Sequence, residues 1–470
     1  MLFPTLQFAI FFGLTLLLHR SLPLRARSGI LLGASLIFYA LWIPPYIFLL
    51  LGDILVNYLF LQGIYRGRHK KVWLVASIVF TLGLLAGFKY LMPIFAGVTA
   101  WWGVENGTQP IWPEVILPLG ISFYSFQIIG FAVDAYRGDE GAKRVPLARY
   151  ALFISFFPQL IAGPILRGSE MLPQLERGAS NSRLRDRRGI RLLVWGLVKK
   201  VALSDFLLAP FVDTIFASPG QAGIESHWVA IWAFAFQIYF DFSGYTDMAR
   251  GLALLLGYEL PDNFLEPYLS RGPAEFWRRW HITLSRWLRD YLYIPLGGNR
   301  KGVSLTYMNL ALTMLLGGLW HGAGWTFIAW GAMHGVMLCV ERALGQRKGV
   351  TVGEGLGWVD APRIFLFFQL TCFSWVFFRA DNLPAAFDFF GGLFGTAGST
   401  GWPLLPTLSV LFCAALHPLE RWARTSPALA SEAGPVSPPV AMLEALVVGL
   451  ALAVVVATSG TGAEFIYFQF

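Results

Sequence analysis

The sequence predicts an all-α, polytopic membrane protein, and three observations carry that prediction. Apolar side chains make up 56% of the 470 residues, whereas Asp, Glu, Lys and Arg together make up only 14%. Apolar runs long enough to cross a bilayer, which takes about 20 residues as a helix, recur from one end of the chain to the other. Lys and Arg gather in short segments between these runs, as the positive-inside rule predicts for cytoplasmic loops.

The apolar runs follow one another at residues 3–18, 30–58, 72–104, 115–133, 150–166, 192–215, 228–256, 305–338, 364–378, 404–416 and 442–456. Several exceed one crossing, so we expect about eleven to thirteen membrane helices with interfacial or re-entrant segments. The first run lacks a basic flank and a small-residue cleavage site, so we expect it to be retained as the first membrane helix. No polar segment is long enough to bury a core of its own, which predicts a single integral-membrane domain over residues 1–470.

The basic clusters lie at residues 20–27, 66–71, 183–191, 199–200, 271–301 and 342–348. Short basic segments between apolar runs indicate the cytoplasmic borders of membrane helices, with membrane lipid as their neighbour and no nucleic-acid partner. The chain has no H-E-x-x-H or C-x-x-C spacing, so no metal is expected. It also lacks the G-x-S-x-G elbow and the P-loop of other catalytic classes.

Ionisable groups inside membrane segments are costly, which makes each of them a candidate functional residue. Asp241 lies four residues after Gln237 and therefore on the same helical face. Its carboxyl could pair with an arginine, support a reacting histidine or relay a proton. Earlier in the chain, Pro158, Gly163 and Pro164 predict either a kink or a break in a helix. A break at membrane depth survives only inside protein or beside a watery cavity.

The segment 274–302 predicts an interfacial helix with arginines that reach for the headgroups. Bulky side chains recur on one face at intervals of three and four residues, at Trp277, Trp280, Leu284, Trp287 and Tyr291. Glu275 is placed to pair with Arg279 four residues later. On this pattern alone, His281 is a packing residue at headgroup level more readily than a catalyst.

Two further histidines stand among tryptophans and glycines in GGLWHGAGWTFIAWGAMHG, residues 317–335. Forty residues separate Lys301 from Arg342, enough for two helices at about 1.5 Å per residue. The midpoint falls at His321 and the glycines of HGAG, so we expect His321 at a bend.

His334 follows His321 by thirteen residues, about 20 Å along one continuous helix. The two imidazoles therefore share a reacting atom only if the helix breaks between them, and His281 is the available partner for His321. A neutral imidazole at a bend and walled by tryptophans suits a general base near neutral pH.

The runs FWRRWHITLSRWLRDYLYIPLGGNR and LTMLLGGLWHGAGWTFIAWGAMHG closely resemble the membrane-bound O-acyltransferase family, in particular its bacterial branch that O-acetylates secreted polysaccharides such as alginate. LPLGISFYSFQ, FFPQLIAGPILR, QIYFDFSGYTDMARG and FIYFQF match the same branch in the same order, so the resemblance covers nearly the whole chain. It implies a ring of membrane helices around a central funnel. The family histidine matches His321, and its second, less invariant polar position matches His281.

The resemblance also implies a function for these residues. His321 would deprotonate an acceptor hydroxyl and His281 would assist, while Asp241, Gln237 and His334 are weaker candidates for lining the channel or the substrate site. The acetyl donor would be acetyl-CoA from the cytoplasm, with no bound cofactor. Periplasmic acetyltransferases would be the partners of a multi-pass protein in the bacterial inner membrane. The acceptor would be either a sugar or such a partner protein.

Two other classes of function stay open on the sequence. In a proton-coupled transporter, Asp241 and the histidines would relay protons, although the chain shows no paired inverted halves of the kind that transporters often have. A non-catalytic scaffold of a polysaccharide secretion complex would keep its activity after loss of His321.

Overall fold

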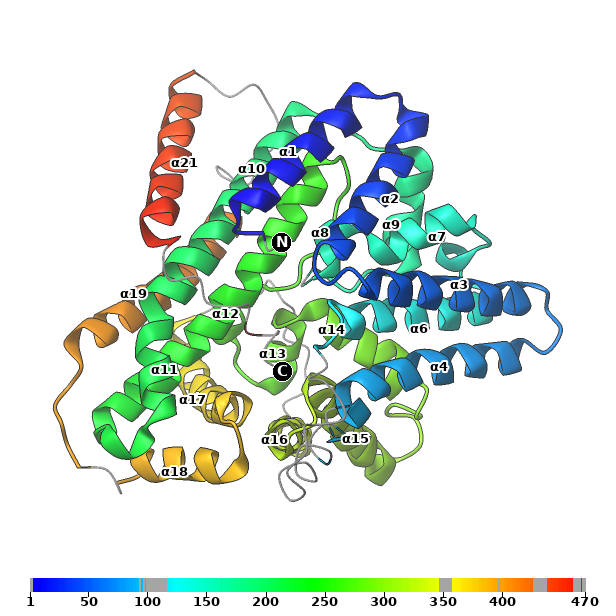
Figure 1. Ribbon diagram of the computed structural model, residues 1–470. Coiled ribbons are helices and arrows are strands. Elements are labelled where there is room, and N and C mark those ends of the chain that lie inside the picture. Colours follow the sequence, from blue (N-terminus) through cyan, green and yellow to red (C-terminus); the bar gives the residue numbers. More distant parts are fainter. Residues whose placement is uncertain are drawn as a thin grey trace, which may run out of the picture. The chain divides into compact units, whose positions relative to one another are not determined.

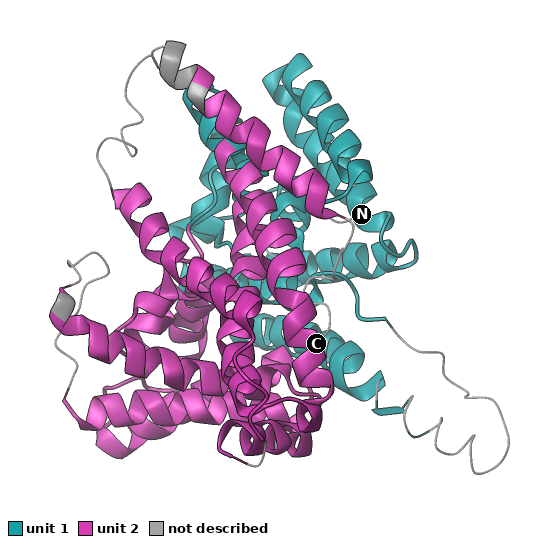
Figure 2. Ribbon diagram, turned by 90° about the vertical axis from the view of Figure 1, so that its left-hand side faces the viewer, with its two compact units in different colours: residues 1–190, 249–261 teal, residues 191–248, 262–470 magenta. Residues whose placement is uncertain are grey.

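The computed structural model describes residues 3–92, 94–95, 98, 116–161, 163–345, 357–395, 398–425, 438–459 and 466. Within these ranges the regular secondary structure is helical, and no strand occurs. The chain divides into two compact units, residues 1–190 with 249–261 and residues 191–248 with 262–470 (Figure 2). The far end of the predicted run 72–104 and most of the terminal FIYFQF lie outside the described residues. The one-domain organisation stays a prediction.

The first unit is helical, and its helices are given below in the order in which they follow along the chain (Figure 1). They are α1 (Leu6–Ser21), α2 (Leu24–Ala40), α3 (Tyr46–Tyr65), α4 (Lys70–Ala86), η1 (Gly87–Leu91), α6 (Ile121–Arg137), η2 (Glu140–Ala142), α7 (Leu147–Ser155), α8 (Phe157–Leu160), α9 (Gly168–Arg177) and the start of α10 (Arg183–Leu197). Buried polar side chains join α3 to α4: the Asn57 amide donates to Asp53 Oδ1 over 2.6 Å and accepts from Ser77 Oγ, also over 2.6 Å. Hydrogen bonds between polar side chains of neighbouring helices commonly stabilise helix packing in a bilayer.

The predicted interruption at residues 156–167 is a true break and more than a kink. Helix α7 ends at Ser155, Phe156 leaves the helical region with ψ of 105°, and α8 lasts only four residues. Phe156, Leu160 and Ile165 are all buried. The irregular backbone is therefore enclosed by protein, the condition under which it is tolerated at membrane depth.

The second unit contains the remaining helices and the buried aromatic core (Figure 1). They are the rest of α10, η3 (Val198–Leu208), α11 (Ala209–Ala217), η4 (Pro219–Gln221), most of α12 (Ile224–Leu255), η5 (Pro267–Leu269), α13 (Pro273–Arg279), α14 (Ile282–Trp287), η6 (Leu288–Tyr293), α15 (Val303–His321), α16 (Trp325–Ala343), η7 (Trp358–Asp360), α17 (Ala361–Arg379), α18 (Leu383–Leu393), α19 (Leu404–Thr425) and α21 (Pro438–Thr458).

In the described part of the chain, four helices are long and apolar enough to cross a membrane: 46–65, 70–91, 303–321 and 361–379. Shorter apolar helices cover Leu6–Ser21, Leu383–Leu393 and Glu444–Thr458. The protein is thus an all-α polytopic membrane protein, as predicted. The count of about eleven to thirteen crossings and the ring with its funnel stay predictions.

Helices α15 and α16 form the hairpin predicted between Lys301 and Arg342. Their backbones approach closely where glycines face each other: a Cβ added at Gly318 would overlap the Phe327 carbonyl oxygen, and one added at Gly331 would overlap that of Met314. The missing side chains allow the two helices to pack at backbone contact, which fixes the turn that carries His321.

We therefore expect Gly318→Ala to destabilise the protein by roughly 1–3 kcal/mol, the usual cost of inserting a methyl group into a closely packed site. Thermal unfolding in one detergent measures the effect. Gly83→Ala is the matched control, because an added Cβ there meets no atom within 4 Å, and it should leave the midpoint unchanged or raise it. Equal midpoints for both variants would contradict the close packing.

Candidate functional site

His321 is the last residue of α15 and lies at the predicted bend. Gly322 follows in an extended conformation and α16 begins at Trp325. The imidazole is only 5% exposed and sits in a box of aromatic rings. Its centroid lies 4.8 Å from Trp320, 5.0 Å from Trp330 and 5.1 Å from Phe378, each ring at a steep angle. The surrounding rings leave the imidazole little access to bulk water.

Two tryptophans link His321 to the other predicted histidines. The Trp320 ring contacts His281 at a centroid distance of 6.3 Å, and the Trp330 ring contacts His334 at 4.8 Å. Together these five residues form what we call the histidine–tryptophan row: His281, Trp320, His321, Trp330 and His334. The structure thus gathers three predicted site residues that lie far apart in sequence, although the sequence placed only His281 beside His321.

The backbone of His281 is in the left-handed region, with φ of 42°, which costs a non-glycine residue about 1–2 kcal/mol. Asn263 supports this conformation: its carbonyl oxygen accepts from the Ile282 N–H over 3.0 Å, and its Oδ1 accepts from both the N–H and the hydroxyl of Thr283. Strain held by such support is a common feature of functional sites.

The same Asn263 Oδ1 lies 3.3 Å from His281 Nδ1. An amide oxygen only accepts, so His281 Nδ1 carries the proton and the lone pair is on Nε2. Burial lowers the pKa of His281 to about 3. Around neutral pH the imidazole is therefore uncharged, with Nε2 as its acceptor.

The left-handed residue also breaks the predicted interfacial helix, so the expectation of one helix over 274–302 is wrong. The segment is α13, α14 and η6, with the break at Trp280 and His281. Arg279 is fully buried and does not reach for the headgroups; its Nη2 pairs with Glu275 Oε1 over 2.7 Å, which confirms that predicted pair. Burial raises the pKa of the Glu275 carboxyl, but hydrogen bonds from Arg271 and Arg279 outweigh it and lower the pKa overall.

His334 lies on α16 and is fully buried. Its Nε2 is 3.1 Å from Ser374 Oγ, whose own proton goes to the Thr371 carbonyl over 2.7 Å. The serine oxygen must therefore accept from His334, so Nε2 is the protonated nitrogen. This fixed hydrogen bond gives His334 a structural anchor on α17.

Asp241 and Gln237 do not join the row. Asp241 Oδ1 pairs with Lys200 Nζ at 2.5 Å, and its Oδ2 accepts the Ile466 N–H over 2.7 Å. Neither Asp241 nor Gln237 bonds to a histidine among the described residues. Of the three roles left open for Asp241, structural pairing is the one seen, with a lysine in place of an arginine. Phe242, the residue after Asp241, does contact the row: its ring centroid lies 4.7 Å from that of His281.

Lys199 and Lys200 are buried and paired, so they do not form an exposed basic loop; their place at a cytoplasmic border stays a prediction. Lys200 also pairs with Asp205, at 2.8 Å. Lys199 pairs with Asp247 at 2.9 Å and with Glu420 at 2.6 Å. The π-helical stretch η3 carries both lysines, and its wider turn places two consecutive side chains inside the unit.

Sequence reasoning missed the residues that support the row: Asn263, Ser374, Phe378 and Trp375, whose ring centroid lies 6.0 Å from that of Trp330. Asn263 gave one weak signal, its place in the polar stretch PDN shortly after the apolar run 228–256. Ser374 and Phe378 gave none, because they lie in an ordinary apolar helix. Among the described residues, no group of three or more His, Cys, Asp or Glu side chains is placed to hold a metal ion.

The row offers imidazole nitrogens in a buried aromatic setting, close to a backbone turn. Such a site can take a proton from a hydroxyl and return it to a leaving group. Ser374 bonds to a histidine of the row, but its hydroxyl proton is already committed to the Thr371 carbonyl.

The model of the membrane-bound O-acyltransferase family matches residues 121–348, which include every predicted site residue. The chain is 41% identical over 399 residues to the probable alginate O-acetylase AlgI of Azotobacter vinelandii, covering 82% of this chain and 76% of that protein. It is 42% identical over 384 residues to the corresponding protein of Pseudomonas aeruginosa, covering 79% and 70%. It is 39% identical over 397 residues to the peptidoglycan O-acetyltransferase of Helicobacter pylori, covering 78% and 73%.

Proposed function

This chain belongs to the membrane-bound O-acyltransferase family, and on that premise we propose that it passes acetyl groups across the bacterial inner membrane for O-acetylation of a secreted polysaccharide of the alginate or cellulose type. It is a membrane acyltransferase by family. The observation that carries the proposal is the histidine–tryptophan row, because it supplies a buried base within the matched region.

In the proposed step, His321 removes the proton from an acceptor hydroxyl. The hydroxyl oxygen attacks the thioester carbonyl of acetyl-CoA, forming the C–O bond as the C–S bond breaks. The proton then passes from the imidazolium to the departing thiolate, so the reaction is balanced without a further reagent. Acetyl-CoA is a substrate in this scheme, and no bound cofactor is required.

His281 is proposed to assist through Trp320, which contacts both imidazoles. Its Nε2 lone pair and neutral state allow it to accept a hydrogen bond from the acceptor or to orient the indole. His334 is given a positioning role, since it holds Trp330 against His321. Asp241 and Gln237 are proposed only to shape the walls around Phe242.

The relatives share the acetyl group that their names state but differ in the polymer, which is alginate for one and peptidoglycan for another. The polymer therefore has to be identified by experiment. We propose that the acetyl group is handed to a periplasmic acetyltransferase of the same polysaccharide system, which places it on the polymer. Deleting the chain and restoring it in trans, followed by acetyl analysis of each extracytoplasmic polysaccharide, tests this. The polymer that loses and regains acetyl identifies the pathway, and no change in any polymer would overturn the proposal.

We expect Asn263→Ala to reduce acetyl transfer by roughly tenfold to a hundredfold, the range for misplacing a catalytic group by about 1 Å. Loss of Oδ1 frees the turn at His281 and removes the partner of its Nδ1. Acetyl content per amount of membrane protein is the readout. Asn382→Ala, which removes an Asn that caps α18 far along the chain, is the matched control and should leave transfer unaffected.

A further inference from the structure

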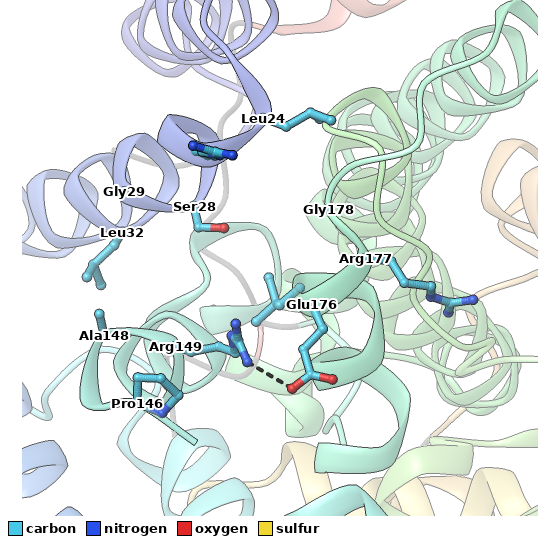
Figure 3. A pocket seen from close by; sticks show the side chains of 12 residues that line it. Leu24, Ser28, Gly29, Leu32, Pro146, Ala148, Arg149, Glu176, Arg177 and Gly178 are labelled. Atoms are coloured by element: carbon cyan, nitrogen blue, oxygen red, sulfur yellow. Dashed lines mark hydrogen bonds and ion pairs between the residues drawn. The ribbon is translucent and has the colours of Figure 1, made fainter. Parts of the chain in front are cut away.

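A cavity of about 480 Å³ lies in the first unit, bordered by the first turns of α2 and α7 and the last turn of α9 (Figure 3). Three arginines, one from each helix, line it: Arg25, Arg149 and Arg177. Glu176 is the acid among the lining residues, and Leu32 and Leu175 give the cavity an apolar wall. Three positive charges against one negative charge favour an anionic occupant.

The three arginines differ in whether their guanidinium groups already have hydrogen-bond partners in the protein. Arg149 Nη1 donates to Glu176 Oε1 over 2.8 Å, as the dashed line in Figure 3 shows. Arg177 donates to the Pro173 carbonyl, and its side chain extends away from the middle of the cavity (Figure 3). Arg25 is exposed and has no hydrogen bond or ion pair with any residue that the structure describes. Its guanidinium is therefore available to a ligand.

The N-termini of two helices add to the positive electrostatic potential of the arginines. α2 and α7 begin directly after Pro23 and Pro146, and neither has a side chain that caps its first N–H groups. Arg25 and Ala148, from these first turns, line the cavity. Unsatisfied N–H groups and the helix dipole reinforce anion binding there.

The surroundings of the cavity indicate which anion it takes. The turn between α1 and α2 belongs to the basic segment 20–27, which the positive-inside rule assigns to the cytoplasmic border of the membrane. Leu24 and Leu147 beside the cavity are exposed, so apolar surface continues outward from the basic site. Basic pockets between membrane helices on this side are suited to anionic lipid headgroups.

We propose that this cavity binds the phosphate of an anionic phospholipid of the cytoplasmic leaflet, such as phosphatidylglycerol, with Arg25 as the principal cation and the acyl chains over Leu24 and Leu147. A soluble phosphate compound shares the headgroup chemistry but leaves the leucines uncovered. The lipid occupant uses both the charge and the apolar rim, and this site is independent of the proposed acetyl transfer.

The test is a titration of the purified full-length protein in a mild neutral detergent with water-soluble dihexanoyl phosphatidylglycerol, with bound lipid counted by native mass spectrometry. Dihexanoyl phosphatidylcholine, inorganic phosphate and coenzyme A are the comparison ligands. We expect phosphatidylglycerol to bind more tightly than phosphatidylcholine. Arg25→Gln should weaken it about fivefold, the value of one cation beside an anionic headgroup.

Arg68→Gln is the matched control, because Arg68 is an exposed arginine in the turn between α3 and α4 and does not line the cavity. It removes the same charge and should leave the affinity unchanged, while Arg25→Lys should retain most of it. Equal affinity in the wild-type and Arg25→Gln proteins would overturn the proposal. So would binding of coenzyme A or inorganic phosphate that displaces phosphatidylglycerol at equal concentration, since the occupant would then be a soluble phosphate.

Discussion

Cells that carry His321→Ala are expected to secrete a polysaccharide without O-acetyl groups. Removing a general base lowers the rate of the catalysed step about 10²- to 10⁴-fold. At such a rate we expect the polymer to be exported without acetyl groups. The imidazole is packed against Trp320, Trp330 and Phe378 at the end of α15, and none of these three side chains can act as a base. Acetyl content is measured on purified polymer at matched amounts of membrane protein.

His417→Gln is the control for the loss of a buried imidazole. His417 is 1% exposed and accepts the Tyr268 N–H over 3.3 Å, but it has no ring contact with the histidine–tryptophan row. Acetylation should follow the amount of this variant in the membrane. If the His321→Ala polymer were acetylated normally, the scaffold interpretation would replace catalysis.

Lys200→Met should lower the free energy of unfolding by about 3–5 kcal/mol, the usual cost of removing one partner from a buried ion pair. Lys200 lies between Asp205 and Asp241, and all three side chains are nearly inaccessible. Its removal leaves two carboxylates without their cation inside the second unit. We expect little of the variant in the membrane and a much lower unfolding midpoint in detergent.

Two further variants separate the charge effect from lost packing. Lys200→Met combined with Asp205→Asn and Asp241→Asn removes both stranded charges and should recover much of the stability. Lys143→Met removes an exposed lysine that pairs with Glu140 at the surface, and such pairs contribute about 0–1 kcal/mol. A Lys200→Met protein as stable as Lys143→Met would show that the buried cluster does not support the fold.

The α15–α16 hairpin could be predicted because its signals are local. The basic residues at both ends fix its length, and the glycines after His321 mark the turn. The break at 156–167 was visible for the same reason, since its prolines and glycine act on their own backbone. Local signals of this kind need no knowledge of distant partners.

The errors came from partners that are distant in sequence. Periodicity predicted one helix through His281, but Asn263, eighteen residues earlier, stabilises the left-handed turn that breaks it. Charge clustering placed Lys199 and Lys200 at a surface, whereas Asp241 and Glu420, 41 and 221 residues later, hold them inside. A pattern within a short window contains no information about such pairs.

The histidine–tryptophan row was predicted only in part. His281, His321 and His334 were all candidates from the sequence. His334 was predicted to lie apart from His321, because the thirteen residues between them were measured along one continuous helix. The turn at Gly322 folds α16 back, and the Trp330 ring then contacts both His321 and His334. The catalytic roles of these residues remain predictions.

The most direct measurement is the rate at which the purified protein, reconstituted in vesicles with the acceptor identified by deletion, moves labelled acetyl from acetyl-CoA to that acceptor. We expect transfer with release of free thiol by the wild-type protein, and a rate at least about a hundredfold lower for the folded His321→Ala protein. Transfer by His321→Ala at the wild-type rate would contradict this expectation.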